Sequence, residues 1–174
     1  RQIQKNDTFI GIKGENFDGN KLWKEALDKG AKAIIIQDTE FNKSDIQKYK
    51  DKIIIKVQNT RKALLEIATL KREMYGNDLK VVGVTGSVGK TSTKDIIANV
   101  LSKKYKTLKT EGNNNNSVGL PFTILRLKDE EVAVIEMGMN HLGEIDELTK
   151  IAKPDIAMIT NIGTAHMGNL GARE

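Results

Sequence analysis

Short apolar runs alternate with amphipathic stretches along the whole chain. Residues 33–36 are apolar at every position, which is typical of a buried strand. Residues 60–75 instead carry Leu64, Ile67 and Ala68 at helical spacing, so that these side chains share one face. Patterns of these two kinds predict strands at residues 8–12, 33–36, 53–57, 80–85, 132–136 and 156–160, and helices at residues 20–30, 44–50, 60–75, 90–104 and 144–152.

The order of these elements indicates the fold class. Strands that alternate with helices form parallel βαβ units with right-handed crossovers, so we predict an α/β protein. Gly76, Asn77 and Asp78 end the long helix and form the best candidate linker. We therefore predict a small amino-terminal α/β domain at residues 1–77 and a second parallel-sheet domain at residues 78–174.

Composition and charge narrow the function classes. The 174 residues include 39% hydrophobic side chains, enough for packed cores, and the apolar runs are far shorter than a membrane span. The absence of cysteine excludes disulfide scaffolds, thiolate zinc sites and cysteine nucleophiles. The net charge of +5 comes from lysines dispersed among Asp and Glu, with one Trp, three Tyr and four Phe available to stack on bases. We therefore expect no nucleic-acid partner.

The segment between the strand at 80–85 and the helix at 90–104 has the pattern of a phosphate-binding loop. Its glycines allow backbone N–H groups to point at phosphate oxygens, and the helix N-terminus adds partial positive charge. Lys90 would reach the β- and γ-phosphates, and the Thr91 hydroxyl would ligate Mg²⁺. The general pattern has Gly where this chain has Val84, so an ordinary glycine turn before a chance Gly-Lys-Thr is the alternative. The predicted ATP- or GTP-binding residues are Thr85, Gly86, Ser87, Val88, Gly89, Lys90, Thr91 and Ser92.

Polar residues follow two further predicted strands. Glu136 ends the strand at 132–136, where a carboxylate beside a phosphate loop would hold the metal; the alternative is a solvated turn residue. His166 follows the strand at 156–160 and would complete a metal shell, unless it is a plain surface histidine. His141 is equally a loop histidine near a helix start. The asparagine-rich residues 112–121 fit both a loop held by Asx turns and a loop whose amides hold a polar ligand.

These motifs occur in the same order in the Mur ligases, the ATP-dependent amide-forming enzymes of peptidoglycan synthesis. The chain resembles this family at residues 85–91, 112–121, 136–141 and 161–166. A phosphate loop without glycine at position 84 is that family's variant. Within the family, the asparagine loop is most similar to that of ligases that add D-alanyl-D-alanine to UDP-N-acetylmuramoyl tripeptide.

The resemblance implies roles for particular residues. Lys90 and Thr91 would lie at the phosphates and magnesium, Glu136 would bind magnesium, and His166 would lie near a second magnesium. The implied catalytic residues are Lys90, Glu136 and His166, and the implied metal ligands are Thr91, Glu136 and His166. The cofactors would be ATP and Mg²⁺.

The resemblance also implies domain roles and chemistry. Residues 1–77 would bind the UDP-substrate, with residues 13–19 facing its UDP-sugar portion, and residues 78–174 would begin a P-loop-type ATPase domain. The asparagine run at residues 113–116 would lie by the nucleotide and substrate, with Asn113 and Asn116 as the expected cofactor-binding residues. The tripeptide carboxylate would attack the γ-phosphate to give an acyl phosphate and ADP, and the amine of D-alanyl-D-alanine would then displace phosphate.

Several expectations concern the whole enzyme. The chain begins at Arg1 rather than Met and stops before a carbamylated lysine that the family places beyond His166, so we expect a fragment without ligase activity. At full length the resemblance implies a monomeric, cytoplasmic bacterial enzyme that does not insert into membranes. The alternatives are a ligase that adds the third peptide residue, a folylpolyglutamate synthetase, which lacks a domain like residues 1–77, and a non-catalytic nucleotide- or UDP-sugar-binding module.

Overall fold

The computed structural model describes residues 3–163 and confirms the α/β fold class. The chain divides into two compact units, residues 1–64 and residues 65–174. The boundary predicted after residue 77 coincides with the turn between α3 (Thr60–Glu73) and β4 (Lys80–Thr85), whereas the compact units divide inside α3. Within the described part of the chain, no helix has the length and apolarity that crossing a membrane requires.

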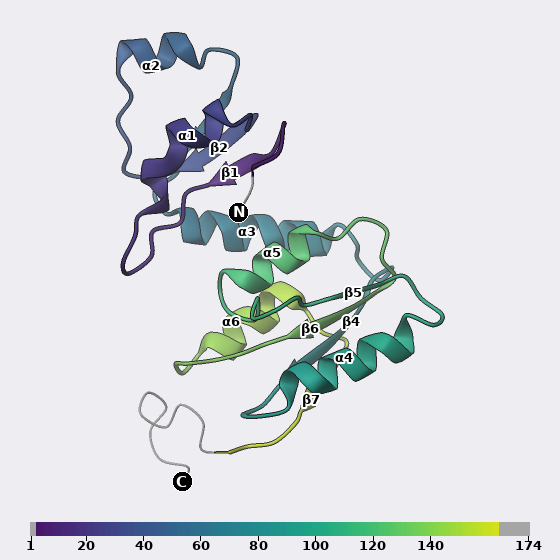
Figure 1. The fold of residues 1–174 in the computed structure, drawn as a ribbon. Helices are drawn as coiled ribbons and strands as arrows, with labels where there is room; N and C mark the ends of the chain where they lie inside the picture. Colours follow the sequence, from purple (N-terminus) through teal and green to yellow (C-terminus); the bar gives the residue numbers. More distant parts are fainter. Residues whose placement is uncertain (1–2, 164–174) are drawn as a thin grey trace. The chain divides into compact units, whose positions relative to one another are not determined.

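The first unit contains a parallel sheet with short helices (Figure 1). Its elements are β1 (Thr8–Ile10), the 3-10 turn η1 (Gly19–Leu22), α1 (Trp23–Asp28), β2 (Ala33–Ile36), α2 (Lys43–Lys48) and β3 (Ile53–Lys56). The strands pair in the order β1-β2-β3, so the most apolar strand lies in the centre. The helix predicted at residues 20–30 is divided into η1 and α1, and α1 ends at Asp28, shortly before Gly30, whose φ of +107° favours glycine.

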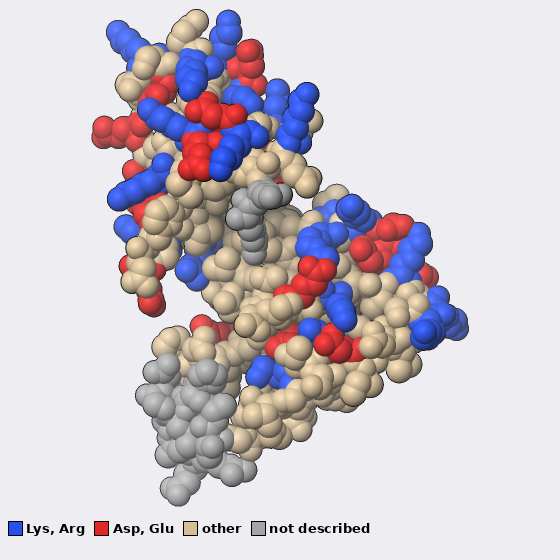
Figure 2. Space-filling model, viewed as in Figure 1, with Lys and Arg blue, Asp and Glu red and all other residues tan. Residues whose placement is uncertain are grey.

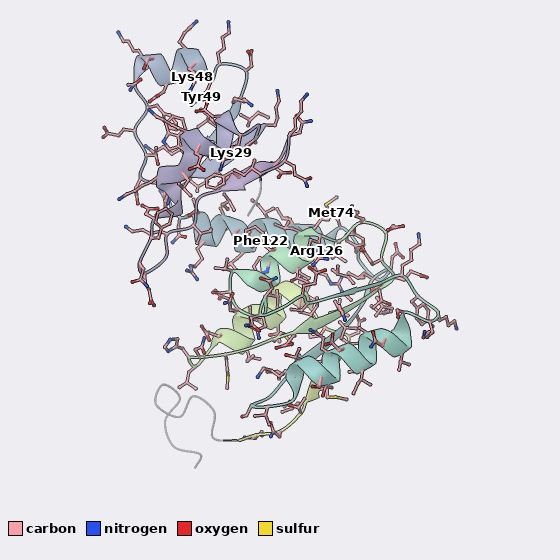
Figure 3. The ribbon with its side chains drawn as sticks, in the orientation of Figure 1. Lys29, Lys48, Tyr49, Met74, Phe122 and Arg126 are labelled. Atoms are coloured by element: carbon pink, nitrogen blue, oxygen red, sulfur yellow. The ribbon has the colours of Figure 1, made fainter. Side chains whose placement is uncertain are left out.

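Aromatic packing forms the core of the first unit. The Trp23 ring meets Phe41 and Tyr49 edge to face, with centroids 4.8 and 5.5 Å apart. The Tyr49 hydroxyl donates a 3.0 Å hydrogen bond to the Asp28 carboxylate, which also pairs with Lys48 (Figure 3). The hydrogen bonds from Lys48 and then Tyr49 lower the pKa of Asp28. These contacts join α1 to the end of α2.

The second unit contains the larger sheet. After α3 and β4, its elements are α4 (Lys90–Leu101), β5 (Thr107–Lys109), α5 (Gly119–Leu125), β6 (Val132–Glu136), α6 (Glu144–Ala152) and β7 (Ile156–Ile159). The strands pair in parallel in the order β5-β6-β4-β7. Residues on one face, such as Val84 and Val134, pack with Ala98 of α4. Ala133 and Ile135 face the other way, into a core shared with α5 and α6. Figure 1 shows these two helices and α4 packed around the sheet.

Two elements of the second unit were not predicted. β5 has only three residues, Thr107–Lys109, too few for an apolar alternation to stand out. α5 occupies the end of the segment predicted to be a loop at residues 112–121, so that prediction was wrong for its last three residues. Pro121 is the third residue of α5, and a helix accepts proline in its first turn because the missing N–H has no intrahelical partner there.

A buried arginine binds the end of α3 into the second unit. Arg72 is 5% exposed, and its guanidinium donates to the carbonyls of Ala152 at 3.0 Å, Gly76 at 3.1 Å and Lys153 at 3.3 Å. A further bond reaches Leu79 at 3.4 Å. The guanidinium thus donates to carbonyls at the ends of α3 and α6 and just before β4. These bonds explain why this part of α3 belongs to the second unit.

Charges of both signs are mixed on the surface. Figure 2 shows lysine and arginine side chains interleaved with aspartate and glutamate on the visible face of the first unit. Several form short exposed pairs, among them Lys29 with Glu25 and, in the second unit, Lys150 with Asp146. Such pairs contribute little to stability because water and salt screen them. The prediction that nucleic acid is not a partner remains a prediction.

Candidate functional site

The predicted phosphate loop lies between β4 and α4, at the carboxyl edge of the second unit's sheet. Gly86 and Gly89 have φ of +130° and +83°, and a side chain at Gly86 would collide with the Thr160 hydroxyl. Lys90 folds over the loop and donates to the carbonyls of Gly86 at 2.7 Å and Ser87 at 3.1 Å. The first N–H groups of α4 lack intrahelical partners and carry the positive end of the helix dipole. The loop therefore has the geometry of an anion site.

The predicted metal ligand Glu136 lies beside this loop. β6 pairs directly with β4, and the register sets Glu136 opposite Val84. The Thr91 hydroxyl donates a 3.0 Å hydrogen bond to Glu136 Oε2, and the Asn115 side-chain amide donates to Oε1 at 2.9 Å. Glu136 is only 2% exposed, so these bonds replace the water that its carboxylate loses on burial. Thr91 and Glu136 thus come together as predicted, while their roles remain predictions.

Sequence reasoning missed Lys94 and did not single out Asn115 within the asparagine run at residues 113–116. Asn115, rather than Asn113 or Asn116, contacts Glu136, and Lys94 places its ammonium 3.8 Å from Glu136 Oε2. One signal could have identified Lys94, because a residue four positions after Lys90 lies on the same helix face. No such signal separates Asn115 from its identical neighbours, since the path of the loop decides which amide reaches Glu136.

The other asparagines have different surroundings. Asn116 Oδ1 accepts the N–H groups of Val118 at 3.0 Å and Gly119 at 2.8 Å, so its side chain starts α5. Asn113 is exposed. His141 is also exposed, and its backbone N–H donates to Glu144 Oε2 at 3.1 Å. None of these described contacts joins Asn113, Asn116 or His141 to Glu136.

The segment after β7 closes on the phosphate loop. The Ser87 N–H donates to the Asn161 carbonyl at 3.1 Å, and the Val88 N–H donates to the Asn161 side chain at 3.0 Å. The Thr160 hydroxyl donates to the Val88 carbonyl at 2.6 Å. Three neighbouring strands, β6, β4 and β7, therefore deliver polar groups to one edge. The predicted ligand His166 lies outside the described residues.

The described residues suit a magnesium ion. Thr91 and Glu136 offer hydroxyl and carboxylate oxygens, the hard ligands that Mg²⁺ prefers. Among residues 3–163, no group of three or more His, Asp and Glu side chains is placed to hold a metal. A site with few protein oxygens fits Mg²⁺ in nucleotide enzymes, because that ion keeps waters and binds phosphate oxygens.

A second ionic cluster extends behind Glu136. Lys109 of β5 lies 2.7 Å from Asp95, and Asp95 lies 3.5 Å from Lys94. The hydrogen bond from Lys109 lowers the pKa of Asp95, with further help from the charge of Lys94. Charged groups therefore continue from the phosphate loop along the inner face of α4.

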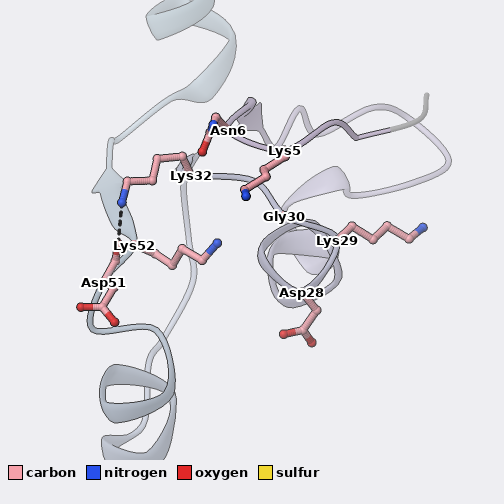
Figure 4. A pocket seen from close by; sticks show the side chains of 8 residues that line it. All are labelled: Lys5, Asn6, Asp28, Lys29, Gly30, Lys32, Asp51 and Lys52. Atoms are coloured by element: carbon pink, nitrogen blue, oxygen red, sulfur yellow. Dashed lines mark hydrogen bonds between the residues drawn. The ribbon is translucent and has the colours of Figure 1, made fainter.

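In the first unit, the predicted UDP-sugar segment and the described cavity lie at opposite ends of the strands. Residues 13–19 follow β1 and form a tight turn, in which the Gly14 N–H donates to the Phe17 carbonyl at 2.9 Å. The cavity instead lies at the amino ends of β2 and β3 (Figure 4), where it is lined by Lys5, Asn6, Asp28, Lys29, Gly30, Lys32, Asp51 and Lys52. Lys32 and Lys52 each donate there to a backbone carbonyl, at 3.1 and 2.7 Å. The role of residues 13–19 remains a prediction.

Comparison with known protein families matches both parts of the chain. The family described as "Mur ligase middle domain" matches residues 84–174, and "Mur ligase family, catalytic domain" matches residues 1–72. The UDP-N-acetylmuramoyl-tripeptide--D-alanyl-D-alanine ligase of Bacillus subtilis is 42% identical over 175 residues, covering 100% of this chain and 37% of the relative. The ligase of the same name from Rickettsia prowazekii is 43% identical over 169 residues, covering 96% of this chain and 35% of the relative.

Solved structures agree with these relatives. A crystal structure of MurF from Acinetobacter baumannii matches with a TM-score of 0.87 at 38% identity, covering 98% of this chain and 36% of that one. MurF ligase from Thermotoga maritima in complex with ADP matches with a TM-score of 0.80 at 41% identity, covering 95% and 37%. The chain thus spans little more than a third of the length of the proteins it matches. The family matches extend over more than half of its residues, and the chain belongs to the Mur ligase family.

Proposed function

We propose that the chain supplies the ATP- and magnesium-binding site of a ligase that joins D-alanyl-D-alanine to UDP-N-acetylmuramoyl tripeptide. The observation that carries this proposal is the 3.0 Å hydrogen bond from Thr91 to Glu136, which joins the phosphate loop to a carboxylate on the neighbouring strand. The names of the matched relatives support the substrate assignment. From the resemblance to the family we also propose that the full-length enzyme is monomeric and cytoplasmic.

In this proposal the chain's own residues hold the nucleotide and balance its charge. The N–H groups at the start of α4 bind phosphate oxygens, and Lys90 moves from the loop carbonyls to the γ-phosphate. The positive charge of Lys90 reduces the repulsion between the γ-phosphate and the incoming tripeptide carboxylate. Thr91 and Glu136 would hold magnesium, with His166 near a second ion, and the metal when bound neutralises charge on the phosphates.

The proposed reaction has two steps. An oxygen of the tripeptide carboxylate bonds to the γ-phosphorus while the bond to ADP breaks, which gives an acyl phosphate. The amine of D-alanyl-D-alanine then attacks the acyl carbon, loses a proton and expels inorganic phosphate. The phosphate loop serves the first step, because it holds the γ-phosphate in line with the attacking carboxylate.

Lys90→Ala in the full-length protein tests the proposal. We expect ligation to fall by about 10³-fold or more and Mg-ATP binding to weaken, because the γ-phosphate loses its nearest cation. Lys103→Ala, a change at an exposed lysine beyond the other end of α4, is the matched control and should retain wild-type turnover. Wild-type ligation by Lys90→Ala would contradict the assignment of the phosphate loop.

The binding-module alternative has a separate test. Phosphate release is measured with Mg-ATP, tripeptide substrate and D-alanyl-D-alanine, for the full-length protein and for the 174-residue chain alone. We expect sustained release from the full-length protein only, since the matched ligases are almost three times as long as this chain. Nucleotide binding without release by the full-length protein would favour a non-catalytic module.

A further inference from the structure

Lys94 is a buried lysine whose function the phosphate loop does not explain. It lies one helical turn beyond Lys90, yet it is only 2% exposed. Its ammonium lies 3.5 Å from Asp95 and 3.8 Å from Glu136 Oε2. A buried ammonium is costly to desolvate unless it is paired, and both of its described neighbours are carboxylates. Its position beneath the loop therefore indicates a charge directed at Glu136.

The phosphate loop and the ionic cluster beside it carry more positive than negative charge. Lys94 and Lys109 balance the carboxylates of Asp95 and Glu136, and Lys90 of the loop adds a third ammonium group. Lys109 is bound closely to Asp95, at 2.7 Å, so Glu136 depends on Lys94 for its counter-charge. A surplus of positive charge attracts phosphate and opposes the approach of a bare divalent cation.

We propose that Lys94 is a positioning residue that acts through Glu136: it holds the carboxylate in place and keeps bare divalent cations out until a nucleotide is bound. The proposal rests on the proposed function, because it takes Thr91 and Glu136 as the metal ligands. Nucleotide phosphates reverse the balance, since they bring several negative charges to the loop. The site therefore accepts magnesium together with the nucleotide rather than before it.

Binding of Mn²⁺ alone, followed by electron paramagnetic resonance on the full-length protein, tests this inference. Wild type should bind Mn²⁺ weakly, and Lys94→Met should bind it about ten-fold more tightly, because one positive charge beside Glu136 is lost. Lys94→Arg keeps the charge and should resemble wild type. Lys109→Met removes a lysine that pairs with Asp95 and should change Mn²⁺ affinity much less.

Three further measurements make the result decisive. The double variant Lys94→Met with Glu136→Gln should lose the gain, whereas a gain that persists would place the ion elsewhere and overturn the proposal. If circular dichroism shows that Lys94→Met does not fold, Lys94→Gln is measured in its place. Equal Mn²⁺ affinity in wild type and the folded neutral variants also overturns it. Mg-ADP binding to wild type is measured separately, and its absence would contradict the proposed function instead.

Discussion

The carboxyl edges of the two parallel sheets hold polar groups of different kinds. In the first unit, Asn20 Oδ1 accepts the Gln37 N–H at 2.9 Å, and Gln37 Oε1 accepts the Thr60 N–H at 2.8 Å. The Thr60 hydroxyl donates to the Gly11 carbonyl at 2.7 Å. In the second unit the corresponding edge presents the Lys90 ammonium and the Glu136 carboxylate.

The two edges differ mainly in the charge of the side chains that they carry. Most groups of the first edge are neutral and hydrogen-bond one another, with one carboxylate, Asp18, accepting from the Asn20 side-chain amide at 2.7 Å. Asn20 and Thr60 are 3% and 1% exposed. They therefore join strand ends to η1 and α3 at low electrostatic cost. The second edge combines charges with a glycine loop and a helix N-terminus, which together suit a phosphate. The parallel topology brings polar groups to both edges, but of the two edges described only the second has this combination of features suited to an anion.

The largest effect on the ligation rate should follow from removing the Glu136 charge at the carboxyl edge of the second unit's sheet. Glu136→Gln keeps the shape of the side chain but removes its charge, so ligation by the full-length protein should fall by about 10²- to 10³-fold and require more magnesium. Magnesium titrations of the ligation rate measure this effect. Binding of the UDP-substrate should change little, and a titration that overlays wild type would refute the metal role of Glu136.

Substitutions at the carboxyl edge of the first unit's sheet should lower the free energy of unfolding rather than the ligation rate. Asn20→Ala leaves the Gln37 N–H buried without its acceptor, so the free energy of unfolding should fall by about 2–3 kcal/mol. Urea denaturation measures the change, and nucleotide affinity should remain that of wild type. Asn99→Ala, at an exposed position of α4, is the control and should cost less than about 0.5 kcal/mol. Weakened nucleotide binding in Asn20→Ala would erase the distinction between the edges.

A smaller change at the same edge sharpens this test. Thr60→Val removes the hydroxyl that donates to Gly11 and Gln37 but keeps the size of the side chain and the Thr60 N–H bond. We expect the free energy of unfolding to fall by about 1–2 kcal/mol, because the Gly11 carbonyl loses a buried donor. Thermal denaturation would detect it. An unchanged melting temperature would mean that water replaces the hydroxyl.

The smallest effect should lie at the amino edge of the second sheet and depend on pH. Asp155 accepts the Val81 N–H at 2.8 Å, and this bond, followed by Lys80, lowers the pKa of its carboxyl. The ionised form therefore stabilises the fold above the ordinary Asp pKa of about 3.9, and this contribution disappears as the pH falls through the lower folded-state value. Asp155→Asn should cost less than about 1 kcal/mol at pH 7, because the side chain is 35% exposed.

The predicted difference between Asp155→Asn and wild type is thus largest at neutral pH and smallest in acid. Urea denaturation at pH 7 and at pH 3 measures both values. A difference of equal size at the two pH values would show that the charge of Asp155 does not provide the stability.

Strong apolar patterns allowed several elements to be predicted to the residue. The strands at 33–36, 80–85 and 132–136 and the helix at 144–152 have the bounds of β2, β4, β6 and α6. Weak patterns failed for a physical reason: β5 is too short to show a period, and α5 begins with Gly119 and contains Pro121, residues that signal turns in isolation.

The same division holds for the candidate site. The sequence by itself was enough to predict the phosphate loop, because its glycines, Lys90 and Thr91 lie in one short segment and their chemistry depends on local backbone geometry. It also indicated Glu136, since a strand pattern ends there. Only the tertiary structure decided that Asn115 reaches Glu136 and that Lys94 is buried beneath it. Those contacts join residues at least 21 positions apart, and their existence depends on how the strands pair and how a loop crosses the sheet edge.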